Sequence, residues 1–183
     1  MHTITRLCWL ITGVLLVAIL IGAVTAAGQA PAEIPAHFDA AGRVTRWTAN
    51  SLGRWLLLPG MAVVLAAGMG WLSSTMPRRP GWVNLPDKER LLALPPMRQA
   101  PVIRRIQALL AAITTQATAI LGGVTLLSWR GATGQPTAQL STVLLVVGLL
   151  STPALLVGFL PWIQAELDRQ HAAWRADGER GRR

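Results

Sequence analysis

Residues 7–32 read LCWLITGVLLVAILIGAVTAAGQAPA, a run without a single Asp, Glu, Lys or Arg. Three further uncharged stretches follow, at residues 55–77, 106–129 and 131–165. Each can cross a bilayer, because about 20 helical residues at about 1.5 Å each span a hydrocarbon core of about 30 Å. We therefore predict an all-α, polytopic integral membrane protein with four transmembrane helices. The predicted spans are residues 7–27, 55–74, 106–129 and 140–163.

The composition supports this class of protein. Of the 183 residues, 52% are hydrophobic and only 14% are charged, which is unusual for a soluble domain. The spans divide the chain into a first helical hairpin with its loop (1–75), a basic loop (76–105), a second helical hairpin (106–165) and a basic tail (166–183). None of the loops and tails is long enough for a soluble catalytic domain. Any chemistry must therefore take place in the membrane or in loops that lie on it.

The distribution of basic residues predicts the orientation. Cytoplasmic loops retain Lys and Arg, and the chain has 17 of them. Only four fall between the first two spans or between the last two: Arg43, Arg46, Arg54 and Arg130. The other thirteen lie on the side of the termini and the central loop, so we predict a multi-pass protein of the cell inner (plasma) membrane with both termini cytoplasmic. This bias also accounts for the net charge of +9, and we expect no nucleic-acid partner.

The first apolar run has an alternative interpretation as a cleaved signal peptide. Arg6, the run itself and the small residues at 23–32 are features of such a peptide. The apolar core of a signal peptide has about 7–15 residues, however, and the run at 7–27 is longer. We therefore expect the first span to be retained.

No Asp, Glu, Lys, Arg or His falls inside a predicted span. Pumps and ion-coupled transporters place ionisable groups at membrane depth, and zinc intramembrane proteases need His and acidic ligands there. The sequence therefore argues against these classes, and we expect no cofactor and no metal.

Two spans carry small and polar residues at helical spacing. They are Gln107, Thr114, Thr118 and Thr125 in the third span, and Ser141, Gly148 and Thr152 in the fourth. Such stripes let helices approach closely and hydrogen-bond to each other. We predict that the third and fourth spans pack stripe to stripe; the alternative is a polar wall that lines a substrate groove.

The loop at residues 31–47 concentrates polar side chains between two spans on the predicted outer side. Its candidate ligand-binding residues are His37, Phe38, Asp39, Gly42, Arg46 and Trp47. Three interpretations are open: a self-capped loop in which Asp39 accepts backbone N–H bonds and pairs with an Arg, a recognition site for an external ligand, or a metal or catalytic site. One His and one Asp supply at most two of the four ligands of a closed zinc site, so metal binding is the least supported.

The central loop contains a second motif, WVNLPDKE at residues 82–89. Asn84 or Asp87 could cap a short amphipathic helix that begins near Pro86. The basic residues around it would contact anionic headgroups. The alternative is docking of a cytoplasmic or membrane protein partner. The candidate residues of this motif are Trp82, Asn84, Pro86, Lys88 and Glu89.

Residues 34–47 read IPAHFDAAGRVTRW, which resembles the signature of the family of domain of unknown function 1648. His37, Phe38, Asp39, Gly42 and Trp47 match that signature position by position. The motif at 82–89 also resembles a segment that follows the second span in longer members, although the usual Tyr-Trp after the Glu is absent. The resemblance implies distant kinship with SdpI-type bacterial immunity proteins, which protect the producing cell against a secreted peptide toxin.

These observations lead to two functional hypotheses. The first is a non-enzymatic bacterial inner-membrane protein, immunity-like or sensor-like, that binds an external ligand such as a peptide through the 31–47 loop. The second is a membrane enzyme acting near the outer leaflet, with His37 and Asp39 as acid and base, or an accessory or structural subunit of a membrane complex. Glu33 is the only other acidic residue on the predicted outer side, so the sequence favours the first and assigns no catalytic residue.

Overall fold

The computed structural model describes residues 2–180. Four helices in it are long and apolar enough to cross a membrane, which confirms the predicted membrane fold. The sequence did not predict the two short strands between the first two helices. The elements are α1 (His2–Gln29), β1 (Glu33–Phe38), β2 (Val44–Ala49), α2 (Leu52–Thr75), the 3-10 turn η1 (Pro80–Trp82), α3 (Lys88–Ala93), α4 (Pro96–Ala132) and α5 (Ala138–Arg180). Of the basic residues counted above, Arg182 and Arg183 lie outside the described residues.

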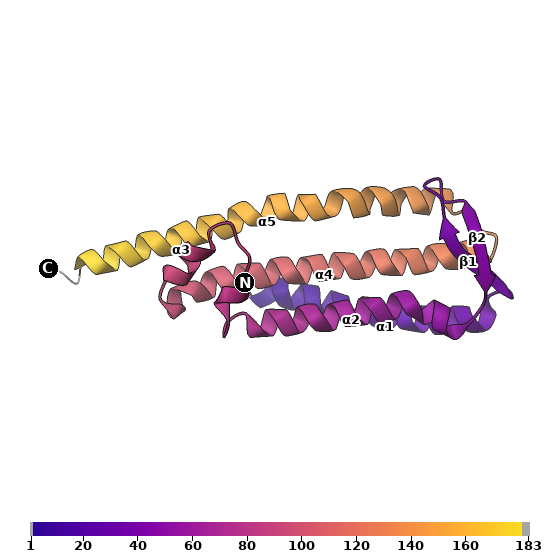
Figure 1. The fold of residues 1–183 in the computed structure, drawn as a ribbon, viewed down its shortest axis with the longest axis horizontal. Helices are drawn as coiled ribbons and strands as arrows, with labels where there is room; N and C mark the ends of the chain where they lie inside the picture. Colours follow the sequence, from indigo (N-terminus) through magenta and orange to yellow (C-terminus); the bar gives the residue numbers. More distant parts are fainter. Residues whose placement is uncertain (1, 181–183) are drawn as a thin grey trace.

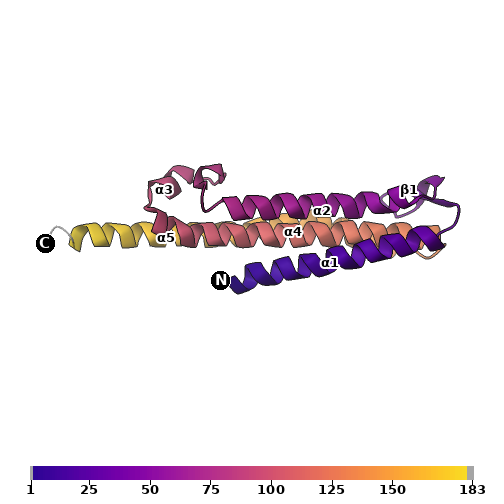
Figure 2. The same ribbon diagram turned by 90° about the horizontal axis from the view of Figure 1, so that it is seen from below.

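The four long helices run side by side, with α1, α2 and α4 packed on one another (Figures 1 and 2). Among the four long helices, α5 packs chiefly along α4, and it extends beyond the other three. The hairpin of β1 and β2 lies across one end of the bundle, which we call the hairpin end. Helix α3 and both ends of the chain lie at the opposite end, the α3 end (Figure 1). An even number of spans is expected to bring the two ends of the chain to the same side of the bundle, as seen here.

Many large apolar side chains point away from the bundle. Leu149 and Val157 in α5 are 74% and 73% exposed, and Val64 in α2 is 73% exposed. In water such faces would be unstable, but lipid tails are as apolar as these side chains. The chain is therefore a multi-pass membrane protein whose helices contact the bilayer directly.

The polar stripe of α4 packs on α1 and α2. Thr114 and Thr118 are buried, Gln107 donates to the Ser73 carbonyl of α2 at 2.7 Å, and Gly122 faces Ile19 of α1. The small side chains allow the close approach that the sequence predicted.

The predicted stripe-to-stripe packing of the third and fourth spans is wrong. Helix α5 meets the opposite face of α4, where Gln116 donates to Ser151 at 2.6 Å and to Thr152 at 2.8 Å. Gln116 lies about 180° around the helix from Gln107, at about 100° per residue. The spacing predicted a close-packed face correctly, but α1 and α2 occupy that face.

Candidate functional site

The outer loop of the sequence forms an antiparallel β-hairpin. Ile34 pairs with Thr48, Pro35 with Trp47 and Phe38 with Val44, and the register shifts on both sides of His37, whose partner is Arg46. Strand β2 reads VTRWTA, which is rich in the β-branched and aromatic residues that favour strands. This signal was present in the sequence. A two-stranded hairpin is marginal by itself, so contacts with the helices must hold it.

The turn between the strands is closed by Asp39. Its carboxylate accepts the Arg43 backbone N–H at 2.8 Å and the Arg43 Nε–H at 2.7 Å. The backbone bond from Arg43, and then its side chain, hold the pKa of Asp39 below its ordinary value. Gly42 adopts φ +79°, the left-handed region that favours glycine. The self-capped loop is therefore what the structure contains at Asp39.

The tip of the hairpin rests on α5 and α4. Thr137 Oγ1 donates to the Gly42 carbonyl at 2.7 Å, and a Cβ at Gly42 would lie 2.8 Å from Ser141 Cβ. Phe38 lies against Gly131 of α4, where a Cβ would meet its ring at 3.2 Å. The hairpin is thus fixed to the start of α5 and the end of α4.

The base of the hairpin is joined to α1 and α2 by Asn50. Its side-chain amide donates to the Ala27 and Ala30 carbonyls at 3.2 Å, and its Oδ1 accepts the Trp55 indole N–H at 2.9 Å. Trp55 is only 3% exposed and lies 6.4 Å from the Trp129 ring. The sequence analysis placed position 55 only at the start of a predicted span and did not single out Asn50. In the structure both residues belong to the packed contact between the hairpin, α1 and α2.

A cavity of about 820 Å³ lies beneath the hairpin, between α2, α4 and α5. Its charged groups come from the hairpin and the start of α2, and its mostly apolar walls come from the helices. The charged and ionisable side chains at its border are His37, Asp39, Arg46 and Arg54. The apolar walls are Leu57 and Leu58 of α2, Ile120, Val124 and Leu127 of α4, and Leu144 and Leu145 of α5. We call this space the hairpin cavity.

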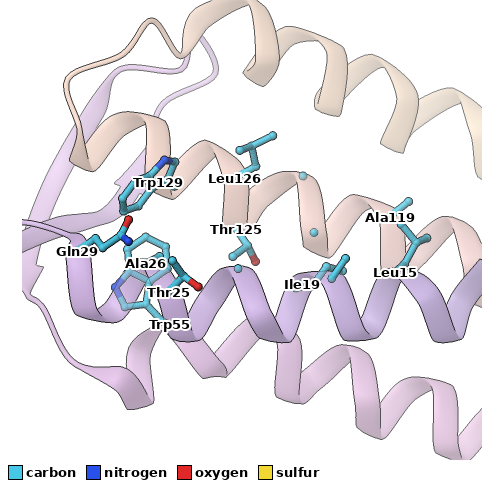
Figure 3. Close-up of a pocket in the computed structure, with 14 residues that line it drawn as sticks. Leu15, Ile19, Thr25, Ala26, Gln29, Trp55, Ala119, Thr125, Leu126 and Trp129 are labelled. Carbon is cyan, nitrogen blue, oxygen red and sulfur yellow. The ribbon is translucent and has the colours of Figure 1, made fainter.

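A second cavity, of about 570 Å³, lies between α1 and α4 (Figure 3). Figure 3 shows Gln29, Trp55 and Trp129 gathered at one end, with Leu15 and Ala119 at the other. No charged side chain lines it. Trp55 and Thr125 border both cavities. These two side chains therefore lie between the uncharged second cavity and the hairpin cavity.

The structure divides the predicted loop residues into three groups. His37 and Arg46 border the hairpin cavity, and the His37 Nδ1 lies 2.7 Å from Thr45 Oγ1. Asp39 also borders it, but its carboxylate is held by Arg43, while Phe38 and Gly42 anchor the hairpin. Trp47 is 47% exposed and does not border the cavity. Arg54 joins His37 and Arg46, and sequence reasoning did not single it out as a site residue.

The second motif lies at the opposite end of the bundle. The ring centroids of Trp82 and Trp71 lie 5.8 Å apart, and Cζ of the Arg79 guanidinium lies 4.6 Å from the Trp82 ring centroid. A short helix begins at Lys88 as expected, with Asp87 at the N-cap position but without a side-chain capping bond. The remaining candidate residues of the motif, Asn84, Pro86 and Glu89, are exposed. The two motifs therefore do not form one site.

The α3 end also contains a buried ion pair that the sequence did not reveal. Arg105 of α4 donates to the Glu166 carboxylate of α5, and both side chains are at most 7% exposed. The Arg105 guanidinium also lies 4.4 Å from the Trp162 ring. The two charges lie just outside the predicted spans, so a search for charges within spans could not find them.

Within residues 2–180, no group of three or more His, Cys, Asp and Glu side chains could hold a metal ion. Residues 13–63 match the family model for a domain of unknown function (DUF1648). The comparison with curated proteins and the comparison with solved structures each gave no match. The matched region runs from within α1 into α2 and contains the whole hairpin, whereas the motif at 82–89 lies outside it. The chain is therefore a multi-pass membrane protein in which residues 13–63 are similar to the domain of unknown function that this family model describes.

Proposed function

We propose that this protein is a non-enzymatic binding protein that takes up an amphipathic ligand at the hairpin end. The observation that carries this proposal is the hairpin cavity, which combines two arginines at its border with apolar walls. Its volume of about 820 Å³ falls in the usual range of ligand sites, about 300–1,000 Å³. His37, Arg46 and Arg54 are the polar contacts, and the helices bury the apolar part of the ligand.

We further propose that the hairpin end faces outward from the inner membrane. The excess of basic residues at the α3 end supports this orientation. To test it, Ala41→Cys and Pro95→Cys are made separately in a Cys8→Ser background and exposed to an impermeant thiol reagent on intact spheroplasts. Labelling at position 41 but not at position 95 is expected, and the reverse pattern would reject the orientation.

The enzymatic alternative has less support. An acid–base pair of His37 and Asp39 needs a carboxyl that exchanges protons near neutral pH. Arg43 holds the Asp39 carboxylate with two hydrogen bonds and keeps its pKa low, so this group stays ionised. A binding role needs no such exchange. A sensor or immunity role toward an external peptide, suggested by the family resemblance, is one specific form of the same proposal.

Occupancy of the hairpin cavity can be measured directly. Ser128 borders the cavity, so Ser128→Cys in the Cys8→Ser background places a thiol there. We expect its alkylation by a maleimide to be at least about tenfold slower in native membranes than in delipidated, detergent-purified protein. Val147→Cys, on an exposed part of α5 outside the cavity, is the matched control for general shielding by the bilayer. Equal slowing at the two positions would contradict a bound ligand.

A further inference from the structure

We infer that the occupant of the hairpin cavity is an anionic phospholipid. Its acidic headgroup lies between Arg46 and Arg54, and an acyl chain lies along the walls formed by α2, α4 and α5. The inference rests on the proposed function, because it names the chemical class of the ligand for that same site.

The charge at the cavity border is the first step of the argument. Arg46 and Arg54 both border the cavity, and neither forms an ion pair with an acidic side chain among residues 2–180. The one carboxylate in the lining of the cavity, Asp39, is held by Arg43. Two guanidinium groups without acidic partners next to apolar walls favour an anionic ligand, since their planar N–H groups match phosphate oxygens.

The walls supply the second step. Below the hairpin, the cavity is lined mainly by aliphatic side chains of three helices, for example Leu57 of α2, Val124 of α4 and Leu144 of α5. Helix α5 packs on α4 but not closely on α2, so the cavity lies where these two helices are separated. An acyl chain would bring no polar group of its own into this space.

A peptide fits the walls less well than a lipid chain does. Each residue of a peptide brings an N–H and a C=O group that need partners away from water. Ser128, one of the few polar groups on the helical walls, already donates to the Val124 carbonyl at 3.1 Å. The border of the cavity also lies at the level expected for headgroups, because Arg54, directly before the predicted span at 55–74, is part of it.

The headgroup contact is tested by native mass spectrometry of the full chain released from detergent. The purified, delipidated protein is titrated with phosphatidylglycerol or with phosphatidylcholine carrying the same acyl chains. We expect the wild type to retain one phosphatidylglycerol with at least about tenfold preference, and the Arg46→Gln/Arg54→Gln variant to lose that preference. Arg130→Gln, which removes one charge from the same end of the bundle but outside the cavity, is expected to keep most of it.

The acyl-chain contact has its own pair of variants. Val124→Phe places a larger side chain in the cavity and should weaken retention of phosphatidylglycerol by about tenfold. Val147→Phe makes the same change on the exposed face of α5 and should leave retention unchanged. Absence of a headgroup preference, or equal effects of the cavity variants and their controls, would overturn the lipid assignment.

The Ser128→Cys assay separates failure of the lipid assignment from failure of the proposed function. If protection in native membranes disappears when lipids are exchanged for phosphatidylcholine, the lipid assignment is supported. If protection survives that exchange but is lost after protease treatment of the outer face, the ligand is a peptide and only the lipid assignment falls. If no protection exists in native membranes, both proposals fall.

Discussion

The two ends of this molecule are built in opposite ways. At the α3 end, ten buried apolar residues drawn from the α2–η1 turn, the η1–α3 segment, α3, α4 and α5 form one core. The members of this core are Met76, Val83, Leu91, Leu94, Val102, Ile103, Ile106, Leu109, Ile163 and Leu167. At the hairpin end the buried cluster is smaller, and a cavity of about 820 Å³ lies between part of the hairpin and the helices beneath it.

This difference indicates which end has room for a ligand. Ion pairs reinforce the α3 end, where Arg90 binds Asp168 at 2.7 Å and Arg98 binds Asp177. These contacts tie the long C-terminal part of α5 to α3 and to the start of α4. The hairpin end instead relies on a few specific contacts at Asn50, Gly42 and Phe38. A packed joint resists change, whereas an end with unfilled space can admit another molecule.

The largest effect is expected at the buried ion pair of the α3 end. Glu166→Gln leaves Arg105 buried without its counter-charge, so the free energy of unfolding should fall by about 3–5 kcal/mol. Reversible unfolding in mixed detergent micelles would measure this loss.

Asp168→Asn is the matched control for Glu166→Gln. It breaks a pair with Arg90 in which the Asp168 side chain is 63% exposed. Its cost should be about 0–1 kcal/mol. Similar losses for the two variants would mean that the α3 end does not depend on its buried pair.

The second effect concerns the anchor of the hairpin on α5. Gly42→Ala adds a strained φ and a clash with Ser141, so we expect a loss of about 2–4 kcal/mol, or local detachment of the hairpin. Gly134→Ala shares the positive φ of +71° but has open space around it, and should cost about 1–2 kcal/mol. Hydrogen exchange of residues 33–49 would reveal detachment. Equal exchange in the two variants would argue against the α5 anchor.

The third effect lies midway between the two ends. Gln116→Leu removes the hydrogen bonds from α4 to Ser151 and Thr152 of α5. Interhelical polar contacts in membranes contribute about 0.6 kcal/mol on average and up to about 1.7 kcal/mol, so the loss should stay within that range. Equilibrium unfolding in micelles would measure it. A loss as large as that of Glu166→Gln would show that α5 is held mainly at its middle.

The smallest effect is expected at the turn of the hairpin, and it depends on pH. The folded-state pKa of Asp39 lies below its ordinary value of 3.8, so its contribution to stability is present above about pH 4. It is lost as the pH falls through the lowered folded-state value. The protection factors of residues 33–49 against hydrogen exchange, taken relative to the intrinsic exchange rate at each pH, should therefore fall below pH 4 in the wild type. Asp39→Asn should exchange somewhat faster at neutral pH and lack the acid step; an identical acid step would assign it to another group.

Sequence alone predicted the membrane class and the approximate spans. The physical reason is that hydrocarbon excludes charge, so four long uncharged runs have few other stable arrangements. The capping role of Asp39 was also one of the three interpretations that the sequence allowed, because an acidic side chain followed by a glycine is typical of a tight turn. Those properties depend on residues close together in the chain.

The tertiary structure alone decided which surfaces meet. Helical spacing showed that α4 has a small, polar face, but any apolar neighbour could have covered it, and α1 and α2 do so in place of α5. The pairing of Arg105 with Glu166 likewise joins residues that are 61 positions apart. The cavity that Arg46 and Arg54 border is completed by residues of α4 and α5, which lie far from them in the sequence. Hydropathy measures only how each residue partitions between water and lipid. Which helix packs on which depends on the mutual fit of side chains across the bundle, and that fit leaves the hairpin cavity open.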